Sequence, residues 1–195
     1  MKTLVTLLML AACSTSPIEQ EKKPTKASWP NSAWQNYAYE KSIVLPRTTD
    51  EKEWCQNGFS NRANFVHLLA AMAKMESNFK PRLEYEESFK NGRGERVIST
   101  GLFQVSYESA RGYGFSGVTT EQLKDPYKNI DVAISILKKW AERDGVISNS
   151  SGTTWRGGAR YWSVLRHSRW DSRAKKWVPN SANKRLKEYL KGFCE

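Results

Sequence analysis

The sequence predicts a mainly α-helical domain of the α+β class, in which helices surround one buried helix beside a small β-hairpin or loop lobe. An apolar stripe at helical spacing from Phe65 to Phe79 indicates the buried helix. A second clear helix opens at Asp125-Pro126, where a capping residue precedes a proline at the first helical position. Asn91-Gly92-Arg93-Gly94, set between short apolar stretches, is a strong turn signal and predicts the hairpin.

The remaining elements follow from caps and helix breakers. Ser60 or Asn61 caps the buried helix, and Pro81 is expected to stop it. We further predict a helix over 30–45, a short helix to about Arg111, one turn after Thr119 capped with Gln122, a loop over 146–154, a helix over 155–165 and a last helix from Ser181 to about Leu190. The architecture is therefore predicted to hold one small β element.

The first residues have the pattern of an export signal. A positive start is followed by an apolar run too short to span a membrane, and then by Leu10-Ala11-Ala12-Cys13. This end resembles a bacterial lipobox, which implies lipidation of Cys13, and Ser14 after it favours the outer membrane. The alternative is an ordinary signal peptide with an accidental cysteine.

These features define the expected domain organisation. We assign 1–12 to a lipoprotein signal peptide, 13–28 to a flexible polar tether, 29–50 to an N-terminal wrapping segment and 51–195 to the main domain. The expected location is the periplasm, with the protein held on the outer membrane by acyl chains and not spanning it.

Removal of the signal leaves two cysteines, Cys55 and Cys194. Export to an oxidising compartment makes a disulfide the default expectation, which would tie the start of the main domain to the end of the chain. Two free buried thiols are the alternative. The sequence has no Cys-x-x-Cys motif or His/Cys cluster, so no metal site is predicted.

The chain is strongly basic, with a formal net charge of +11 over 195 residues. This balance suggests an anionic partner, and eight tryptophans and eight tyrosines would suit stacking on nucleic-acid bases. Export argues against nucleic acid. Peptidoglycan, whose stem peptides carry carboxylates, and anionic lipid head groups are the alternatives, beside a basic surface without a dedicated partner.

Glu76 lies on the edge of the apolar stripe, near the end of the buried helix. Partial burial and the negative end of the helix dipole both disfavour the carboxylate anion, and a neutral glutamate near pH 7 is what a general acid requires. The plainer interpretation is a solvated glutamate at a helix end.

Other kinds of chemistry lack their motifs. There is no Gly-x-Ser-x-Gly and no phosphate-binding glycine loop, and neither His67 nor His167 has an obvious nucleophile partner. No cofactor is predicted. Carboxylate chemistry centred on Glu76 is what remains.

Three motifs in order resemble the soluble lytic transglycosylase (SLT) domain, a member of the lysozyme-like superfamily related to goose-type lysozyme. They are Glu76-Ser77-Asn78-Phe79, Gly101-Leu102-Phe103-Gln104 and Leu123-x-Asp125-Pro126-x-x-Asn129-Ile130, and the match extends over about 61–140. The resemblance implies that 51–195 is a lysozyme-like transglycosylase domain whose partner is the peptidoglycan glycan strand. Protein partners are not indicated.

The resemblance also implies roles for individual residues. Glu76 would be the sole catalytic acid/base, and Ser77 would support the site. The stretch Gly101, Leu102, Phe103 and Gln104 would line the sugar-binding cleft. The family's Ala-Tyr-Asn motif is altered here to Ala159-Arg160-Tyr161-Trp162, so Tyr161 is the candidate for the tyrosine that approaches the glutamate.

The family's reaction would cut the MurNAc–GlcNAc β-1,4 bond and close a 1,6-anhydro ring without consuming water. A hydrolytic lysozyme is the close alternative, with Glu84, Glu86, Glu87 or Glu95 of the hairpin activating water. The acidic run Glu84–Glu87 suggests a further hypothesis, a preference for deacetylated glycan. The alternative is that these glutamates are solvated residues of a loop. A non-catalytic, glycan-binding envelope lipoprotein is the competing class.

Overall fold

The computed structural model of the chain describes residues 28–48, 51–151 and 153–194. The predicted signal peptide, Cys13 and the tether up to residue 27 lie outside the described residues. Within the described part, no helix combines the length and the apolar character needed to cross a membrane.

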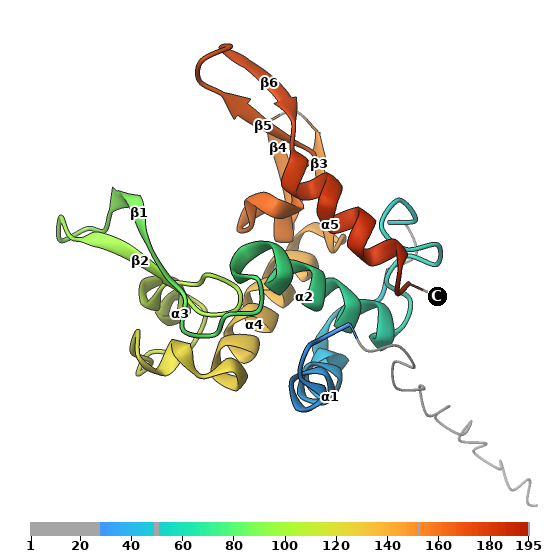
Figure 1. Cartoon of the computed structure of the whole chain (residues 1–195), viewed down its shortest axis with the longest axis horizontal. Coiled ribbons are helices and arrows are strands. Elements are labelled where there is room, and N and C mark those ends of the chain that lie inside the picture. Colours follow the sequence, from blue (N-terminus) through green and yellow to red (C-terminus); the bar gives the residue numbers. More distant parts are fainter. Residues whose placement is uncertain (1–27, 49–50, 152, 195) are drawn as a thin grey trace, which may run out of the picture.

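One buried helix, α2, lies at the centre of the fold, as the sequence predicts (Figure 1). The side chains from Ala63 to Ala73 are almost completely excluded from solvent. The α-helices are α1 (Ser32–Lys41), α2 (Arg62–Ser77), α3 (Tyr107–Gly112), α4 (Pro126–Asp144) and α5 (Ser181–Lys191). Helices α1 and α5 pack against α2, and α1 also packs against α4.

Local capping chemistry sets the ends of the two main helices. The Asn61 side chain accepts from the backbone N–H of Asn64 and starts α2, which ends where Asn78 enters the left-handed region at φ 52°. Asp125 caps α4, and Gly145 ends it at φ 70°. The last residue of α2, Ser77, thus lies four positions before the predicted limit at Pro81.

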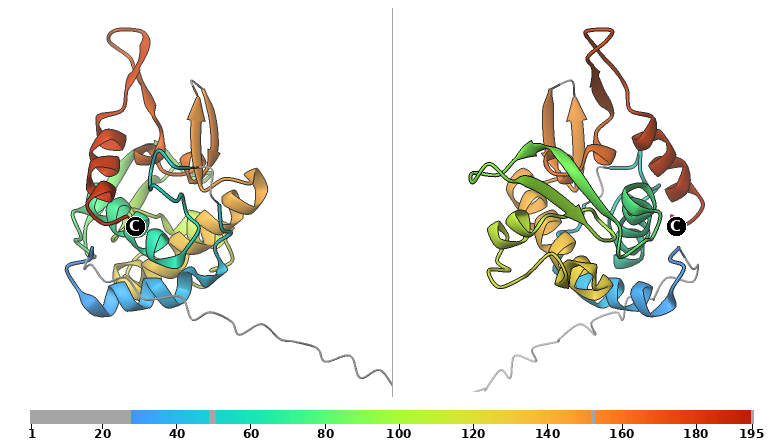
Figure 2. Two further views of the ribbon diagram at one scale, coloured as in Figure 1. Left: turned by 90° about the vertical axis from the view of Figure 1, so that its right-hand side faces the viewer. Right: turned by 60° about the vertical axis from the view of Figure 1, so that its left-hand side comes forward.

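Within the described residues, three separate two-stranded antiparallel sheets project from the helical body (Figure 2). They are β1 (Glu84–Lys90) with β2 (Arg96–Thr100), β3 (Ser148–Ser151) with β4 (Thr154–Gly157), and β5 (Ser168–Asp171) with β6 (Lys176–Pro179). The fold class is confirmed as mainly α with a small β part. The expectation of a single β element is wrong, because the sequence indicated only the first hairpin.

The prediction of a helix over 155–165 is also wrong. This stretch forms the end of β4 and two short 3₁₀ turns, η3 (Gly158–Arg160) and η4 (Ser163–Leu165). Gly157 has φ 59°, and a Cβ atom there would lie 2.3 Å from the carbonyl oxygen of Ile147. The close approach of two backbones at this glycine ends the strand and prevents a continuous helix. Two further 3₁₀ turns are η1 (Ser42–Val44) and η2 (Gln122–Lys124).

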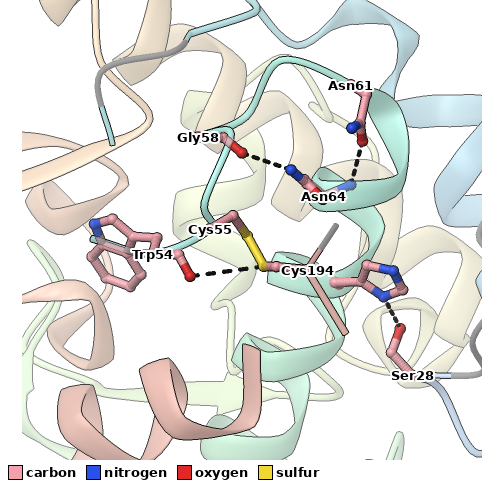
Figure 3. Close-up of a disulfide and its surroundings, with 8 residues drawn as sticks. Ser28, Trp54, Cys55, Gly58, Asn61, Asn64 and Cys194 are labelled. Carbon is pink, nitrogen blue, oxygen red and sulfur yellow. Dashed lines mark hydrogen bonds between the residues drawn. A yellow bond between two sulfur atoms is a disulfide. The ribbon is translucent and has the colours of Figure 1, made fainter. Parts of the chain in front are cut away.

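The two ends of the main domain meet at a disulfide between Cys55 and Cys194, whose Cα atoms are 5.3 Å apart (Figure 3). The bond lies beside the first turn of α2, where the Asn64 side chain donates to the carbonyl of Gly58 at 2.7 Å. The last residues after α5 are thereby fastened to the segment that leads into the central helix.

Candidate active site

Glu76 lies in the last turn of α2 and lines a cleft of about 650 Å³. The cleft is bounded by the β1–β2 hairpin, by the start of α3 and by the segment from η3 to Arg166. The carboxyl group is partly buried and faces this cleft, so it is sheltered from bulk water but accessible to a ligand.

Burial raises the pKa of Glu76 to about 7, and the negative charge of Glu87 contributes to the same rise. The sequence predicted the burial. It did not predict that Glu87 would act as the second cause. A carboxyl group with this pKa is neutral in a large fraction of molecules near pH 7, which allows it to donate a proton.

Glu87 is the hairpin glutamate that faces Glu76 across the cleft. It is partly buried on β1, lines the cleft and accepts a hydrogen bond from Ser99 Oγ at 2.6 Å. Successive residues of a strand point to opposite faces, so Glu86 points away and forms an exposed ion pair with Arg96 at 3.6 Å.

The other two hairpin glutamates have different partners. Glu84 pairs with Lys124 at 3.1 Å, and Glu95 accepts from Asn91 Nδ2 at 3.0 Å near the hairpin turn. Neither lines the cleft. The structure therefore selects Glu87 from the sequence-based candidates for a second carboxylate, and it argues against Glu86 and Glu95.

Tyr161 lies where the altered family motif predicts it, as a neighbour of Glu76 in the cleft wall. Burial raises its pKa to about 12, and it forms hydrogen bonds with the Ser109 side chain and the Ser106 backbone. Arg160, which precedes it, turns away to pair with Asp144 at 2.6 Å. The unusual arginine of the motif therefore stabilises the end of α4 and stays out of the cleft.

Ser77 supports the site from inside the protein. It is buried, and its hydroxyl lies 3.0 Å from the carbonyl oxygen of Ala73 and 2.9 Å from that of Leu102. This hydroxyl fastens the end of α2 to the next motif. A direct contact of Ser77 with substrate is not compatible with this burial.

The Gly101–Gln104 stretch is mostly a packing element, which corrects the expectation that all four residues contact glycan. The side chains of Leu102 and Phe103 are fully buried. Gly101, at φ 80°, would place a Cβ atom 2.3 Å from Asn129 Nδ2. Of this stretch, Gln104 alone lines the cleft.

Asn129 explains why the second and third motifs occur together. Its amide, fully buried, accepts from the Phe103 N–H at 2.9 Å and donates to the carbonyls of Thr100 and Leu123 at 3.0 and 2.8 Å. Trp162 Nε1 donates to the carbonyl of Phe103 at 3.0 Å. The motif stretch is thus fixed from both sides, and this holds the floor of the cleft.

Sequence reasoning missed several residues of the cleft, among them Phe89 and Glu108. Phe89 on β1 is 58% exposed and lines it, which suits an apolar contact with a sugar ring. Glu108, on α3, also lines it, and one of its carboxylate oxygens accepts from Asn91 Nδ2 at 2.9 Å. Its other oxygen is buried without a hydrogen-bond partner among the described residues.

Glu108 also marks where the cleft continues. Asn91, Gly92 and Glu108 line both the cleft and a neighbouring hollow of about 510 Å³. The two hollows together form an extended depression along the hairpin and α3, which suits a polymer better than a small molecule. In the described part of the chain, no group of three or more His, Cys, Asp or Glu side chains is placed to hold a metal ion.

Comparison with known proteins places these features in one family. The transglycosylase SLT domain model matches residues 57–152. Among solved structures, the wild-type form of Bd0314 DslA and two of its glutamate-to-glutamine mutants are each 30% identical, with a TM-score of 0.70, and the match covers 84% of this chain and 92% of theirs. No curated protein sequence matches the chain. The chain therefore belongs to the lytic transglycosylase SLT family of the lysozyme-like superfamily, enzymes that act on the glycan strands of peptidoglycan.

Proposed function

We propose that this protein cuts the β-1,4 bond between N-acetylmuramic acid and N-acetylglucosamine in peptidoglycan, with Glu76 as the acid and base, and leaves 1,6-anhydromuramoyl ends. The observation that carries the proposal is the partly buried Glu76 carboxyl group, with a pKa of about 7, facing a cleft that adjoins a second hollow.

In this reaction the Glu76 carboxyl group acts twice, first as the acid and then as the base. Neutral Glu76 donates its proton to the glycosidic oxygen while the bond from that oxygen to the anomeric carbon breaks. The 6-hydroxyl oxygen of the muramoyl residue then bonds to the anomeric carbon, and its proton returns to the Glu76 carboxylate. No water enters the products, so this route needs no second carboxylate.

Other residues of the cleft suit this route. Tyr161 lies beside Glu76, is neutral at physiological pH and presents a polar group in the cleft wall. Partly buried Arg166 stacks on Trp155 at 3.6 Å and places a positive charge in the same wall. We assign to Arg166 the role of binding a carboxylate of a stem peptide.

Product analysis tests the proposal. The protein is incubated with purified peptidoglycan, and the fragments are examined by mass spectrometry, where an anhydro end is one water lighter than a reducing end. We expect anhydro ends from the wild-type protein. The Glu76→Gln variant is expected to lose about 10³-fold or more in rate, because glutamine cannot donate the proton, while its circular dichroism spectrum stays unchanged. An active Glu76→Gln variant would exclude this mechanism.

Hydrolysis is a second candidate, and Glu87 is the observation that favours it. Its carboxylate faces Glu76 and accepts from Ser99, as a base for a water molecule would. The two glutamates replaced in the DslA mutants are eleven positions apart in that chain, and Glu76 and Glu87 have the same spacing here.

The Glu87→Gln variant separates the two candidates. A lyase is expected to keep its anhydro product with a modest change in rate, whereas a hydrolase would lose its reducing-end product. Digestion in ¹⁸O-labelled water gives an independent readout, since only hydrolysis places the label in the product.

Two carboxylates of the cleft also support the hypothesis of a preference for deacetylated glycan. Of the acidic run Glu84–Glu87, only Glu87 lines the cleft, and Glu108 adds a second carboxylate there. Free amines of glucosamine are cationic and would be attracted to both groups. Equal rates on acetylated and chemically deacetylated peptidoglycan would contradict this preference.

We further propose that the protein is anchored in the outer membrane through lipidated Cys13 and acts in the periplasm. The lipobox-like Leu10-Ala11-Ala12-Cys13 supports this proposal. Metabolic labelling with a fatty acid tests it: the label should appear in the wild-type protein and be absent from the Cys13→Ser variant.

A further inference from the structure

The β5–β6 hairpin is an exposed arm with two tryptophans and a positive charge. Trp170 and Trp177 lie directly opposite each other in the ladder, with ring centroids 5.8 Å apart in an edge-on arrangement. They are 51% and 37% exposed. Large aromatic groups on a small projecting sheet add little to a core, so their exposure needs another explanation.

The charge of the arm is one-sided. Four basic residues and one acidic residue lie in the segment 168–179. The acidic residue, Asp171, accepts from the backbone N–H groups of Arg173 and Ala174 at 3.0 Å each and so fixes the turn. Because the arm's own carboxylate is used in this way, Arg173 and its basic neighbours Lys175 and Lys176, all exposed, present their charge to solvent.

The base of the arm is built into the wall of the cleft. Ser163 and Arg166 line the cleft, and β5 begins at Ser168. Asn180, directly after β6, donates its side-chain amide to the carbonyl of Ser163 at 2.7 Å and its backbone N–H to that of His167 at 2.9 Å. A strand of polymer that leaves the cleft on this side can therefore reach the arm.

The arm also points away from the start of the described chain (Figures 1 and 2). Helix α5 begins at Ser181, beside the base of the arm, and Tyr189 near its other end donates its hydroxyl hydrogen to the carbonyl of Ser28. Eleven helical residues span about 16 Å. Residue 28 and the arm therefore lie at opposite ends of α5.

We propose that the β5–β6 arm is a second binding site for peptidoglycan, outside the cleft, which holds the polymer while the enzyme cuts it. The tryptophan pair would contact apolar faces of sugar rings, and Arg173, Lys175 and Lys176 would attract the carboxylates of stem peptides. The choice of peptidoglycan as the occupant rests on the proposed function. The position of the arm on the cleft wall, at the end of α5 far from residue 28, favours this polymer over an anionic membrane.

Binding is measured apart from cleavage. The full chain carries Glu76→Gln, so that the polymer is not cut, and Cys13→Ser, so that acyl chains cannot cause vesicle binding. Co-sedimentation with insoluble peptidoglycan gives an apparent Kd. In this background, Trp170→Ala with Trp177→Ala is expected to raise the Kd about ten-fold. Trp170→Tyr with Trp177→Tyr should restore most of the binding.

Two matched variants serve as controls. Tyr127→Ala removes an aromatic side chain of similar exposure, 38%, that packs against Tyr37 on another face, and it should leave the Kd unchanged. Arg173→Gln with Lys175→Gln and Lys176→Gln should raise the Kd about five-fold at low salt. In about 1 M salt, where charges are screened within about 3 Å, this charge variant should match the parent.

Cleavage and vesicle assays decide between outcomes. With Glu76 restored, the tryptophan variant should cut short soluble peptidoglycan fragments at the parental rate and insoluble peptidoglycan more slowly. The proposal would be overturned if the tryptophan variant bound insoluble peptidoglycan with an unchanged Kd. It would also be overturned if this variant lost binding to anionic phospholipid vesicles but kept its binding to peptidoglycan. The parent protein could fail to cleave peptidoglycan while the tryptophan variant still binds it more weakly. That result would contradict the proposed function and support the arm as a binding site.

Discussion

Glu76 illustrates how one carboxyl group can serve catalysis at a cost to stability. Its pKa is raised from 4.5 to about 7, so the folded protein holds this proton more tightly than the unfolded chain does. Well below pH 4.5 the carboxyl group is neutral in both the folded and the unfolded state, so its burial adds no ionisation penalty to folding. As the pH rises to 7 and above, folding must place an anion in a poorly solvated site.

This linkage predicts that Glu76→Gln stabilises the protein at alkaline pH. At pH 8 the variant should gain on the order of 1–3 kcal/mol in unfolding free energy, since partial exposure of the group reduces the full effect. At pH 4 the wild type and the variant should be equally stable. Urea denaturation at the two pH values measures the difference, and an equal gain at both would show that ionisation is not its cause.

The charge of Glu87 predicts a shift in the pH dependence of cleavage. A general acid works in its protonated form, so the rate should fall as the pH rises through about 7. Glu87→Gln removes one cause of the raised pKa of Glu76, and the fall should then begin at lower pH. The control is Glu86→Gln, which removes an exposed carboxylate that pairs with Arg96. An identical profile for all three proteins would show that Glu87 does not influence Glu76.

At the scale of the elements, the packing of the Gly101–Gln104 stretch depends on the absence of a side chain at Gly101. Gly101→Ala would place a methyl group 2.3 Å from Asn129 Nδ2 and 2.6 Å from the Leu123 carbonyl oxygen, at a φ of 80° that alanine disfavours. We expect a loss of about 2–4 kcal/mol in unfolding free energy. The change should also displace Gln104 and lower activity.

The matched control is Gly117→Ala, since an added Cβ at Gly117 meets no atom within 4 Å. Its denaturation midpoint should stay close to that of the wild type. A Gly101→Ala protein as stable as this control would show that the buried Asn129 network can shift at little cost.

Local signals predicted some elements well and failed for others. Capping residues predicted the starts of both main helices, because capping is decided within a few residues. Ser60 or Asn61 was expected to cap α2, and Asn61 does; Asp125 caps α4 as predicted. The segment 155–165 has apolar residues that fit a helix, yet the contact of Gly157 with the Ile147 backbone breaks it. The tertiary structure brings Gly157 and Ile147 together, and no local sequence pattern predicts this contact.

The candidate site, too, was predicted where local signals decide and missed where tertiary packing decides. The motif around Glu76 predicted a carboxyl group at the end of a buried helix, and the structure places it there. Burial of Phe103 and the position of Glu108 in the cleft depend on how α3 and Trp162 pack against the helical body. Residue type and spacing alone do not contain this information.

At the scale of the whole molecule, the disulfide closes a loop with a sequence separation of 139. A cross-link over so long a loop restricts the unfolded chain strongly, by about 4–5 kcal/mol in the chain-entropy model. We therefore expect Cys55→Ser with Cys194→Ser to lower the unfolding free energy by about that amount. Urea denaturation of this variant, and of the wild type with a thiol reductant, should give the same midpoint. A midpoint unchanged in both would mean that the packing of α5 on α2 suffices to hold the end of the chain.

The same bond determines how the protein would respond to mechanical tension. If the two ends were drawn apart, only the chain outside the loop could lengthen, and residues 28–55 extend to about 90 Å at most. The cleft, between Glu76 and Arg166, lies wholly inside the loop. A protein pulled at its two ends would unfold α1 first and keep the cleft folded for as long as the two sulfur atoms stay joined.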